Sequence, residues 1–234
     1  MSAVLLHGVV PEGTVRPAEA PGHARWRAGG LLALTSPAPD ALLDDVDGAA
    51  TVQAGLAHDR LLSAYAHIGP VMPIRFGALF SGPDAVRARV SADATVLARG
   101  LSRLGMAREY GVRLVRAAPR EGPRQEALPA EHGRGFLHRR AAARRERRAQ
   151  AGSLGAFLAD VEVRLSRHAA EIRQTGRAGR DRMADLAALV PPERERGFLD
   201  LAEALGPEAA RHGLVLRLGG PWPAYSFCAE ASHG

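Results

Sequence analysis

The chain of 234 residues has one cysteine, Cys228, and contains neither lysine nor asparagine. A single cysteine cannot form a disulfide within the chain, and a zinc site built from several cysteines is disfavoured. A lone thiol is typical of the reducing cytoplasm, where we expect the protein to reside. No run of 18 apolar residues exists and the N-terminus lacks a basic leader, so we expect neither a membrane span nor a signal peptide.

The charged residues are unevenly divided between the two signs. All 31 basic residues are arginine, and they outnumber the 25 acidic residues, which gives a formal net charge of +6. Six of these arginines gather within ten residues: Arg139, Arg140, Arg144, Arg145, Arg147 and Arg148. A solvated helix face is the interpretation we favour, and a nucleic-acid-binding helix is the alternative. The segment has no interleaved aromatic residues for base stacking and no recognisable helix-turn-helix partner, so we expect no nucleic acid.

Motifs that carry catalysis or bind ligands are also missing. The chain has no G-x-x-x-x-G-K-[ST] or G-x-G-x-x-G frame, no H-E-x-x-H and no G-x-S-x-G. The acidic cluster of Asp44, Asp45 and Asp47 lacks the spacing and the terminal glutamate of a calcium loop. We therefore expect no catalytic residues, no cofactor and no metal, while a catalytic site that assembles only in space stays open as an alternative.

Apolar spacing and turn residues predict both strands and helices. In the first half they predict a strand at 2–10, a hairpin at 23–35 turning at Gly29-Gly30, a helix at 51–68, an extended segment at 71–80 and a helix at 83–104. In the second half they predict a strand at 106–117, a loop at 118–129, a long helix at about 131–173, a strand or short helix at 181–191, a helix at 192–212 interrupted at Gly206-Pro207, a strand at 213–218 and a possible further strand at 225–228.

The long helix has an apolar seam only in its second half, formed by Leu154, Leu158, Val161, Leu165, His168 and Ile172. This order of elements predicts an α+β fold in which helices pack on one face of an antiparallel or mixed sheet, as in ferredoxin-like units.

Two segments stand out as candidate contact sites. In P-I-R-F-G at 73–77, Arg75 interrupts an apolar run, which leaves two options: an arginine paired with a carboxylate at a strand end, or an arginine presented to a partner together with Phe76. In GGPWPAYSF at 219–227, Trp222, Tyr225 and Phe227 form either a capping loop or a rigid aromatic anchor for a protein partner.

Several of these segments together resemble a known family. GPVMPIRFGALF at 69–80 resembles the P-x-R-F-G region of the gas vesicle GvpL/GvpF family, and it follows a helix whose His58-Asp59 pair is also similar. GRGFLHRR at 133–140 resembles the family's G-x-x-[YF]-L element, with Phe136 where tyrosine is common, and GGPWPAYSF resembles its C-terminal G-P-W-P-x-Y-S-F. The order and spacing of these motifs agree over essentially the whole chain.

The resemblance implies two α+β domains, which we place at 1–105 and 106–234, the second like a modified ferredoxin fold with the long helix. It implies an accessory or minor structural protein, cytoplasmic and associated with the gas vesicle, that binds the hydrophobic shell protein and other vesicle proteins. Its expected tasks are to prevent aggregation of the shell protein and to assist nucleation and assembly. No catalytic residue is implied.

Overall fold

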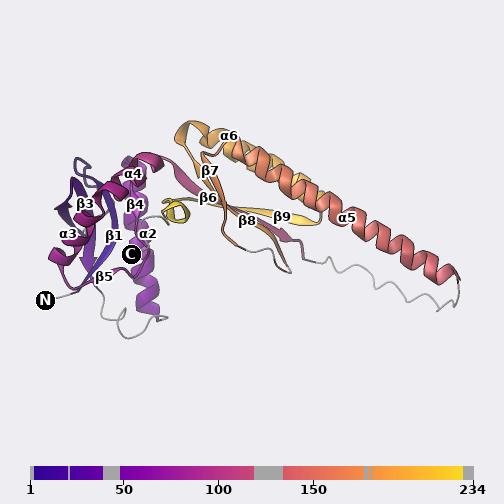
Figure 1. The fold of residues 1–234 in the computed structure, drawn as a ribbon, viewed down its shortest axis with the longest axis horizontal. Helices are drawn as coiled ribbons and strands as arrows, with labels where there is room; N and C mark the ends of the chain where they lie inside the picture. The colour runs from indigo at the N-terminus through magenta and orange to yellow at the C-terminus, as the bar shows by residue number, and fades with distance from the viewer. Residues whose placement is uncertain are drawn as a thin grey trace.

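The computed structural model describes residues 3–20, 22–38, 48–118, 134–176, 179 and 181–228. The acidic cluster at Asp44–Asp47 and nearly all of the predicted loop at 118–129 lie outside these ranges. Figure 1 shows an elongated molecule, with one sheet and its helices at one end, a second sheet beside it, and a long helix projecting at the other end. The described chain thus contains mixed helix and sheet, in agreement with the predicted α+β class.

The first sheet is built on the predicted N-terminal strand and hairpin. Its strands are β1 (Val4–Pro11), β2 (Ala24–Ala28), β3 (Leu31–Pro37), β4 (Met72–Pro73) and β5 (Leu79–Phe80). They lie in the order β2-β3-β1-β4, and β5 also pairs with β1. Gly29 and Gly30 turn the hairpin with positive φ angles of 59° and 79°, which confirms the predicted turn.

Helices cover both faces of this sheet. Side chains alternate along β3 between the two faces of the sheet. Leu32 and Leu34 pack in one core with α2 (Ala49–Ile68), while Leu31 and Ala33 pack in another core with α3 (Pro83–Ala92) and α4 (Ala94–Leu104). The prediction of one helix over 83–104 is wrong because the chain leaves helical geometry at Asp93, where φ is −94° and ψ is 4°. The Asp93 carboxylate accepts a bond of 2.6 Å from the Arg89 guanidinium and holds the break.

The second sheet follows α4 directly. It consists of β6 (Arg108–Arg116), β7 (Glu171–Gln174), β8 (Arg182–Val190) and β9 (Leu214–Trp222), all antiparallel, in the order β7-β8-β6-β9. The long helix α5 (Arg134–Ser166) and helix α6 (Pro192–Arg211) pack on one face (Figure 1). Residues 181–191, for which strand and helix were both open, thus form a strand.

The predicted seam of the long helix is confirmed only as far as Leu165. Val161 and Leu165 are fully buried against the sheet, and Leu154 and Leu158 pack beside them. The predicted end at 173 is wrong, because the helix ends at Ser166 and residues 171–174 form β7. Backbone pairing with β8 replaces the helix, beginning with the bond of 2.7 Å from the Ala170 N–H to the Leu189 carbonyl.

Two further predictions about the C-terminal region are corrected. Helix α6 runs through Pro207 without interruption, because Leu205 and Ala209 are both fully buried and hold the helix against the sheet on either side of the proline. Residues 225–227 form a 3-10 helix rather than a strand, which follows directly after β9 and Pro223-Ala224.

Only the second half of α5 should contribute to stability through packing. We expect Leu165→Ala to lower the free energy of unfolding by about 2–5 kcal/mol, because it empties a fully buried position. Arg145→Ala, in the exposed first half, should change it by less than about 0.5 kcal/mol. Urea denaturation of both variants checks this, and equal losses would contradict the packing described.

Candidate functional site

The two candidate segments meet at one place, the His58-Asp59 pair of α2. The Phe76 ring lies edge-on to His58 at 5.4 Å between ring centroids, and the Tyr225 ring stacks on His58 at 6.2 Å. The Tyr225 hydroxyl also donates a bond of 3.1 Å to the Asp59 carboxylate. Motifs that lie about 150 residues apart in the sequence therefore share a single anchor on α2.

A buried pair of histidines lies beneath this junction. The Nδ1 atoms of His7 on β1 and His58 are 2.9 Å apart, and His7 Nε2 is 2.9 Å from the Ser36 hydroxyl. Because one imidazole must donate and the other accept, the contact excludes protonation of both rings. Burial, aided by the neighbouring His58, lowers the pKa of His7 to about 3, and burial lowers the pKa of His58 to about 4.

The Ser36–His7–His58 chain has the order hydroxyl, imidazole, imidazole, so it must be considered as a possible nucleophile and base. A general base works best when its pKa is near the working pH. The low pKa of His7 makes it a poor base at neutral pH, and both imidazoles are buried, so we interpret these three residues as structural.

Arg75 and Phe76 lie in the turn between β4 and β5. The Ile74 N–H bonds to the His7 carbonyl at 2.9 Å, and Gly77 follows with φ of +94°. Between these fixed points Phe76 turns inward, half-buried, toward His58 and Gly55, while Arg75 is exposed. The Arg75 guanidinium forms no ion pair or hydrogen bond with any residue in the described ranges. Of the two options for Arg75, the structure therefore favours presentation at the surface.

Trp222 lies apart from the His58 junction, at the end of β9. Its six-membered ring lies against two glycines: a Cβ at Gly219 would come within 2.4 Å of the ring, and one at Gly111 within 3.0 Å. The side chain is nevertheless 39% exposed. Trp222 is thus a fixed aromatic surface at the sheet, open to a partner on one side.

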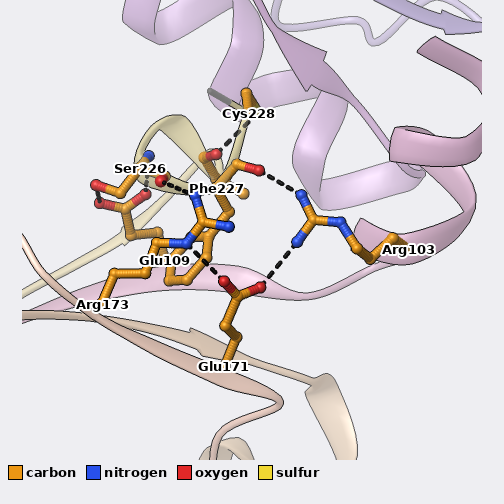
Figure 2. A network of polar contacts seen from close by, with 8 residues as sticks. Arg103, Glu109, Glu171, Arg173, Ser226, Phe227 and Cys228 are labelled. Atoms are coloured by element: carbon orange, nitrogen blue, oxygen red, sulfur yellow. Dashed lines mark hydrogen bonds and ion pairs between the residues drawn. The ribbon is translucent and has the colours of Figure 1, made fainter. Parts of the chain in front are cut away.

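The short 3-10 helix η1 (Tyr225–Phe227) is held by polar contacts from three elements (Figure 2). The Glu109 carboxylate, on β6, accepts bonds of 2.7 Å from both the N–H and the hydroxyl of Ser226. Arg173 on β7 donates to the Ser226 carbonyl at 3.0 Å. Burial raises the pKa of Glu109, and the two bonds from Ser226 partly offset that rise.

Arg103 and Glu171 extend the network to the first half of the chain (Figure 2). Arg103, at the end of α4, donates to Glu171 on β7 at 2.8 Å and also to the Phe227 carbonyl. Glu171 bonds to Arg173 as well, and the Arg173 guanidinium lies over the Phe227 ring at 5.1 Å. The 3-10 helix thus connects α4, β6 and β7.

Phe227 itself is fully buried in a core that contains residues from both sheets, such as Leu6 on β1 and Leu189 on β8. Its ring is not accessible at the surface, so the expected anchor role gives way to packing. Tyr225 is half-buried and its hydroxyl bonds to Asp59. Burial also raises the pKa of the Cys228 thiol, which follows this helix, to about 12. Of the five candidates, only Arg75 and Trp222 are exposed.

Sequence reasoning missed the residues that hold the C-terminal segment, namely Arg103, Glu109, Glu171 and Arg173. Each lies in a segment whose helical or strand pattern gave no sign of a polar role. One signal was present for Glu109, because it is an acidic residue near the start of a predicted strand. The linear sequence does not reveal its long-range partner. The sequence pattern also gives no role to His7, although this residue lies in an otherwise apolar strand.

Comparison with known proteins now gives this arrangement a context. The family model described as gas vesicle synthesis protein GvpL/GvpF matches residues 8–229. The chain belongs to the GvpL/GvpF family. A relative named gas vesicle protein L, from Streptomyces sp. (strain CB03234), is 31% identical, over 96% of this chain and 89% of the relative. The resemblance expected from the separated motifs is thereby confirmed.

Two solved structures share the fold. The crystal structure of gas vesicle protein GvpF from Anabaena sp. PCC7120 matches with a TM-score of 0.72 at 17% identity, over 97% of this chain and 96% of that chain. GvpF from Microcystis aeruginosa matches with a TM-score of 0.67 at 18% identity, over 97% and 99%. At these identities the likeness concerns the fold alone.

The family's description names gas vesicle synthesis and no enzymatic reaction. Within the described ranges, no group of three or more histidine, cysteine or acidic side chains is placed to hold a metal ion. No described helix is both long enough and apolar enough to cross a membrane.

The buried histidine pair predicts an acid-sensitive fold. Below pH 6.5 the unfolded chain protonates both histidines while the folded protein keeps them neutral, so stability is full above pH 6.5 and falls as the pH drops toward 4. The slope should reach about 1.4 kcal/mol per pH unit for each histidine. Urea denaturation at pH 7 and pH 5 should show that His58→Gln loses roughly half of this dependence, and that exposed His138→Gln keeps it all. Identical pH slopes in the wild type and His58→Gln would contradict the prediction.

Glu109 should be the most important polar residue of the C-terminal 3-10 helix. Glu109→Ala leaves the Ser226 N–H and hydroxyl without their acceptor, so we expect a loss of about 1–3 kcal/mol in the free energy of unfolding. Glu203→Ala, an exposed position on α6, serves as the control and should change stability by less than about 0.5 kcal/mol. Equal denaturation midpoints for the two variants would show that the Glu109 contacts carry no stability.

Proposed function

We propose that this protein assists gas vesicle assembly by binding the hydrophobic shell protein, preventing its aggregation and helping nucleation, without catalysing a reaction. The observation that carries the proposal is the family match over nearly the whole chain, since it links this chain to gas vesicle synthesis. We further propose that the protein works in the cytoplasm, in association with the vesicle and with other vesicle proteins.

The physical reason lies in the nature of the client. A shell subunit with a large apolar face aggregates when that face meets water, so a protein that accompanies it must offer apolar surface of its own. Exposed apolar side chains combined with arginine would cover such a face and keep the complex in solution.

One surface with this character surrounds Arg75 and Phe76. Val52 and Leu56 lie one turn apart on α2 and are 56% and 45% exposed, and the Phe76 ring packs against Gly55 between them. Arg75, which directly precedes Phe76, is exposed and adds a positive charge. We propose that this patch is one contact surface for the partner, with Phe76 supporting Arg75 from below.

Trp222 provides the second proposed contact surface. Its ring is fixed by Gly111 and Gly219, so little conformational entropy is lost when a partner covers it. Tyr225 and Phe227, which belong to the same motif, support this surface from inside the molecule through Asp59 and the shared core.

We also propose that the chain consists of two domains divided near residue 105, the second of them ferredoxin-like. Support comes from the order β6-α5-β7-β8-α6-β9 and the strand order β7-β8-β6-β9, both of which match a β-α-β-β-α-β unit. The division falls in the turn at Gly105-Met106 between α4 and β6.

Nucleic-acid binding through the arginines of α5 is the alternative. Residues 138–150 form an exposed helical face rich in arginine, as such binding would require. This stretch carries no aromatic side chain for base stacking. A fluorescence-anisotropy titration with duplex DNA or RNA at low salt decides the matter, and we expect it to stay flat.

Direct binding tests the proposed function. Co-expression with the gas vesicle shell protein, followed by pull-down, should recover a complex and keep the shell protein soluble. Absence of a complex with the shell protein and with every other vesicle protein would contradict the proposal.

Single substitutions should rank the contact residues. We expect Trp222→Ala to reduce vesicle yield more than any single arginine substitution on α5, such as Arg145→Ala, because it removes a fixed aromatic surface. Circular dichroism should show that both variants fold, and yield is measured by the scattering of vesicles in cells. Normal yield with Trp222→Ala would mean that this ring serves packing alone.

A further inference from the structure

The second sheet ends in two edge strands that differ in their protection. β7 is short, only four residues, and its sequence EIRQ carries two charges that discourage pairing with another strand. β9 has nine residues and pairs, among the described strands, with β6 alone. Within the described part of the chain, its outer edge therefore offers unpaired backbone N–H and carbonyl groups.

Apart from the charge of Arg217, the devices that blunt an edge lie at the C-terminal end of β9. Pro221 lacks an N–H, and the register with β6 shifts between Glu109 and Gly111. The preceding stretch LVLRL at 214–218 has neither a proline nor a bulge. Large apolar side chains on this strand are partly exposed: Val215 at 43%, Leu218 at 40% and Trp222 at 39%. A long, apolar edge of this kind is a template for a further strand.

The face of the sheet opposite α5 and α6 gives the edge a specific chemistry. Val215 pairs there with Val115, and Arg217 pairs directly with Arg113. Arg113 is neutralised by Asp185 at 3.1 Å, whereas exposed Arg217 forms no ion pair with any residue that the structure describes. Like charges opposite each other on neighbouring strands are unfavourable. Arg217 therefore has a place for a carboxylate that no described residue fills.

A strand added beside β9 would supply that carboxylate. In an added strand, the residue opposite Arg217 points to the same face of the sheet as Arg217. The residues two positions before and after it lie near Val215 on one side, and near Gly219 and the Trp222 ring on the other. The complementary segment is therefore extended, with an acidic residue flanked at alternate positions by apolar ones.

A second copy of this chain fits the edge poorly. Pairing β9 with its own symmetry mate about Arg217 brings two Arg217 side chains together, between molecules that each carry a net charge of +6. Charge complementarity thus favours a different chain with acidic character.

We infer that β9 is a strand-addition site at which the partner contributes an extended, acidic and apolar segment across from Arg217. Because the partner is taken to be the shell protein, this inference rests on the proposed function. Backbone hydrogen bonds to 214–218 supply affinity, and Arg217 and Trp222 select the side chains.

Amide hydrogen exchange on the full chain, alone and in complex with the gas vesicle shell protein, tests the inference. Amides of 214–218 on the outer edge should exchange at least about tenfold more slowly in the complex. If a complex forms while these amides exchange as in the free protein, strand addition is wrong and the proposed function stands. If no complex with the shell protein forms, the inference falls together with the shell-binding part of the proposed function. Protection that appears in the free protein as its concentration rises would instead identify a second copy as the occupant.

A charge reversal tests the side-chain selection. Arg217→Glu should weaken shell-protein binding at least about tenfold, because it places two carboxylates opposite each other. Arg99→Glu, an exposed position on α4, changes the net charge equally and should leave the affinity unchanged. Equal affinities of Arg217→Glu and the wild type would overturn the assigned acidic contact.

Discussion

The contact on which the rest of the structure depends is the one between Glu109 and Ser226. A carboxylate at the start of β6 accepts two bonds from a single residue near the end of the described chain, and so fixes the 3-10 helix that follows β9. Once that helix is fixed, Phe227 enters the core shared by the two sheets and Tyr225 reaches α2. Without it, the links between the two parts would be the turn after α4, the Arg103–Glu171 bond and a core that lacks Phe227.

This constraint explains why separated motifs occur together in the family. In P-I-R-F-G and G-P-W-P-x-Y-S-F, the inner residues Phe76 and Tyr225 meet at His58, while Arg75 and Trp222 are exposed. Most residues of the motifs therefore maintain the architecture. The surface roles fall to a few exposed side chains that this architecture holds in fixed positions.

Much of the fold could be predicted because local physics controls it. Gly29-Gly30 turned a hairpin as expected, and the seam from Leu154 to Leu165 packed as expected. The errors arose where distant contacts overrode local preference: β8 pairing ended α5 before Ile172, and buried Leu205 and Ala209 carried α6 through Pro207. The candidate site was predicted only in part, since the sequence marked Arg75 and Trp222 but not the buried partners of Tyr225 and Phe227, which depend on tertiary contact.

The most direct test of the account is the unfolding of a chain that ends at Pro223 and so lacks the 3-10 helix. Urea denaturation followed by Trp26 in the first sheet and Trp222 in the second reports on each part separately. We predict that the two probes, coincident in the full chain, separate into two transitions in the shortened one, with a lower midpoint for at least one part. A single transition with an unchanged midpoint for both probes would contradict the account.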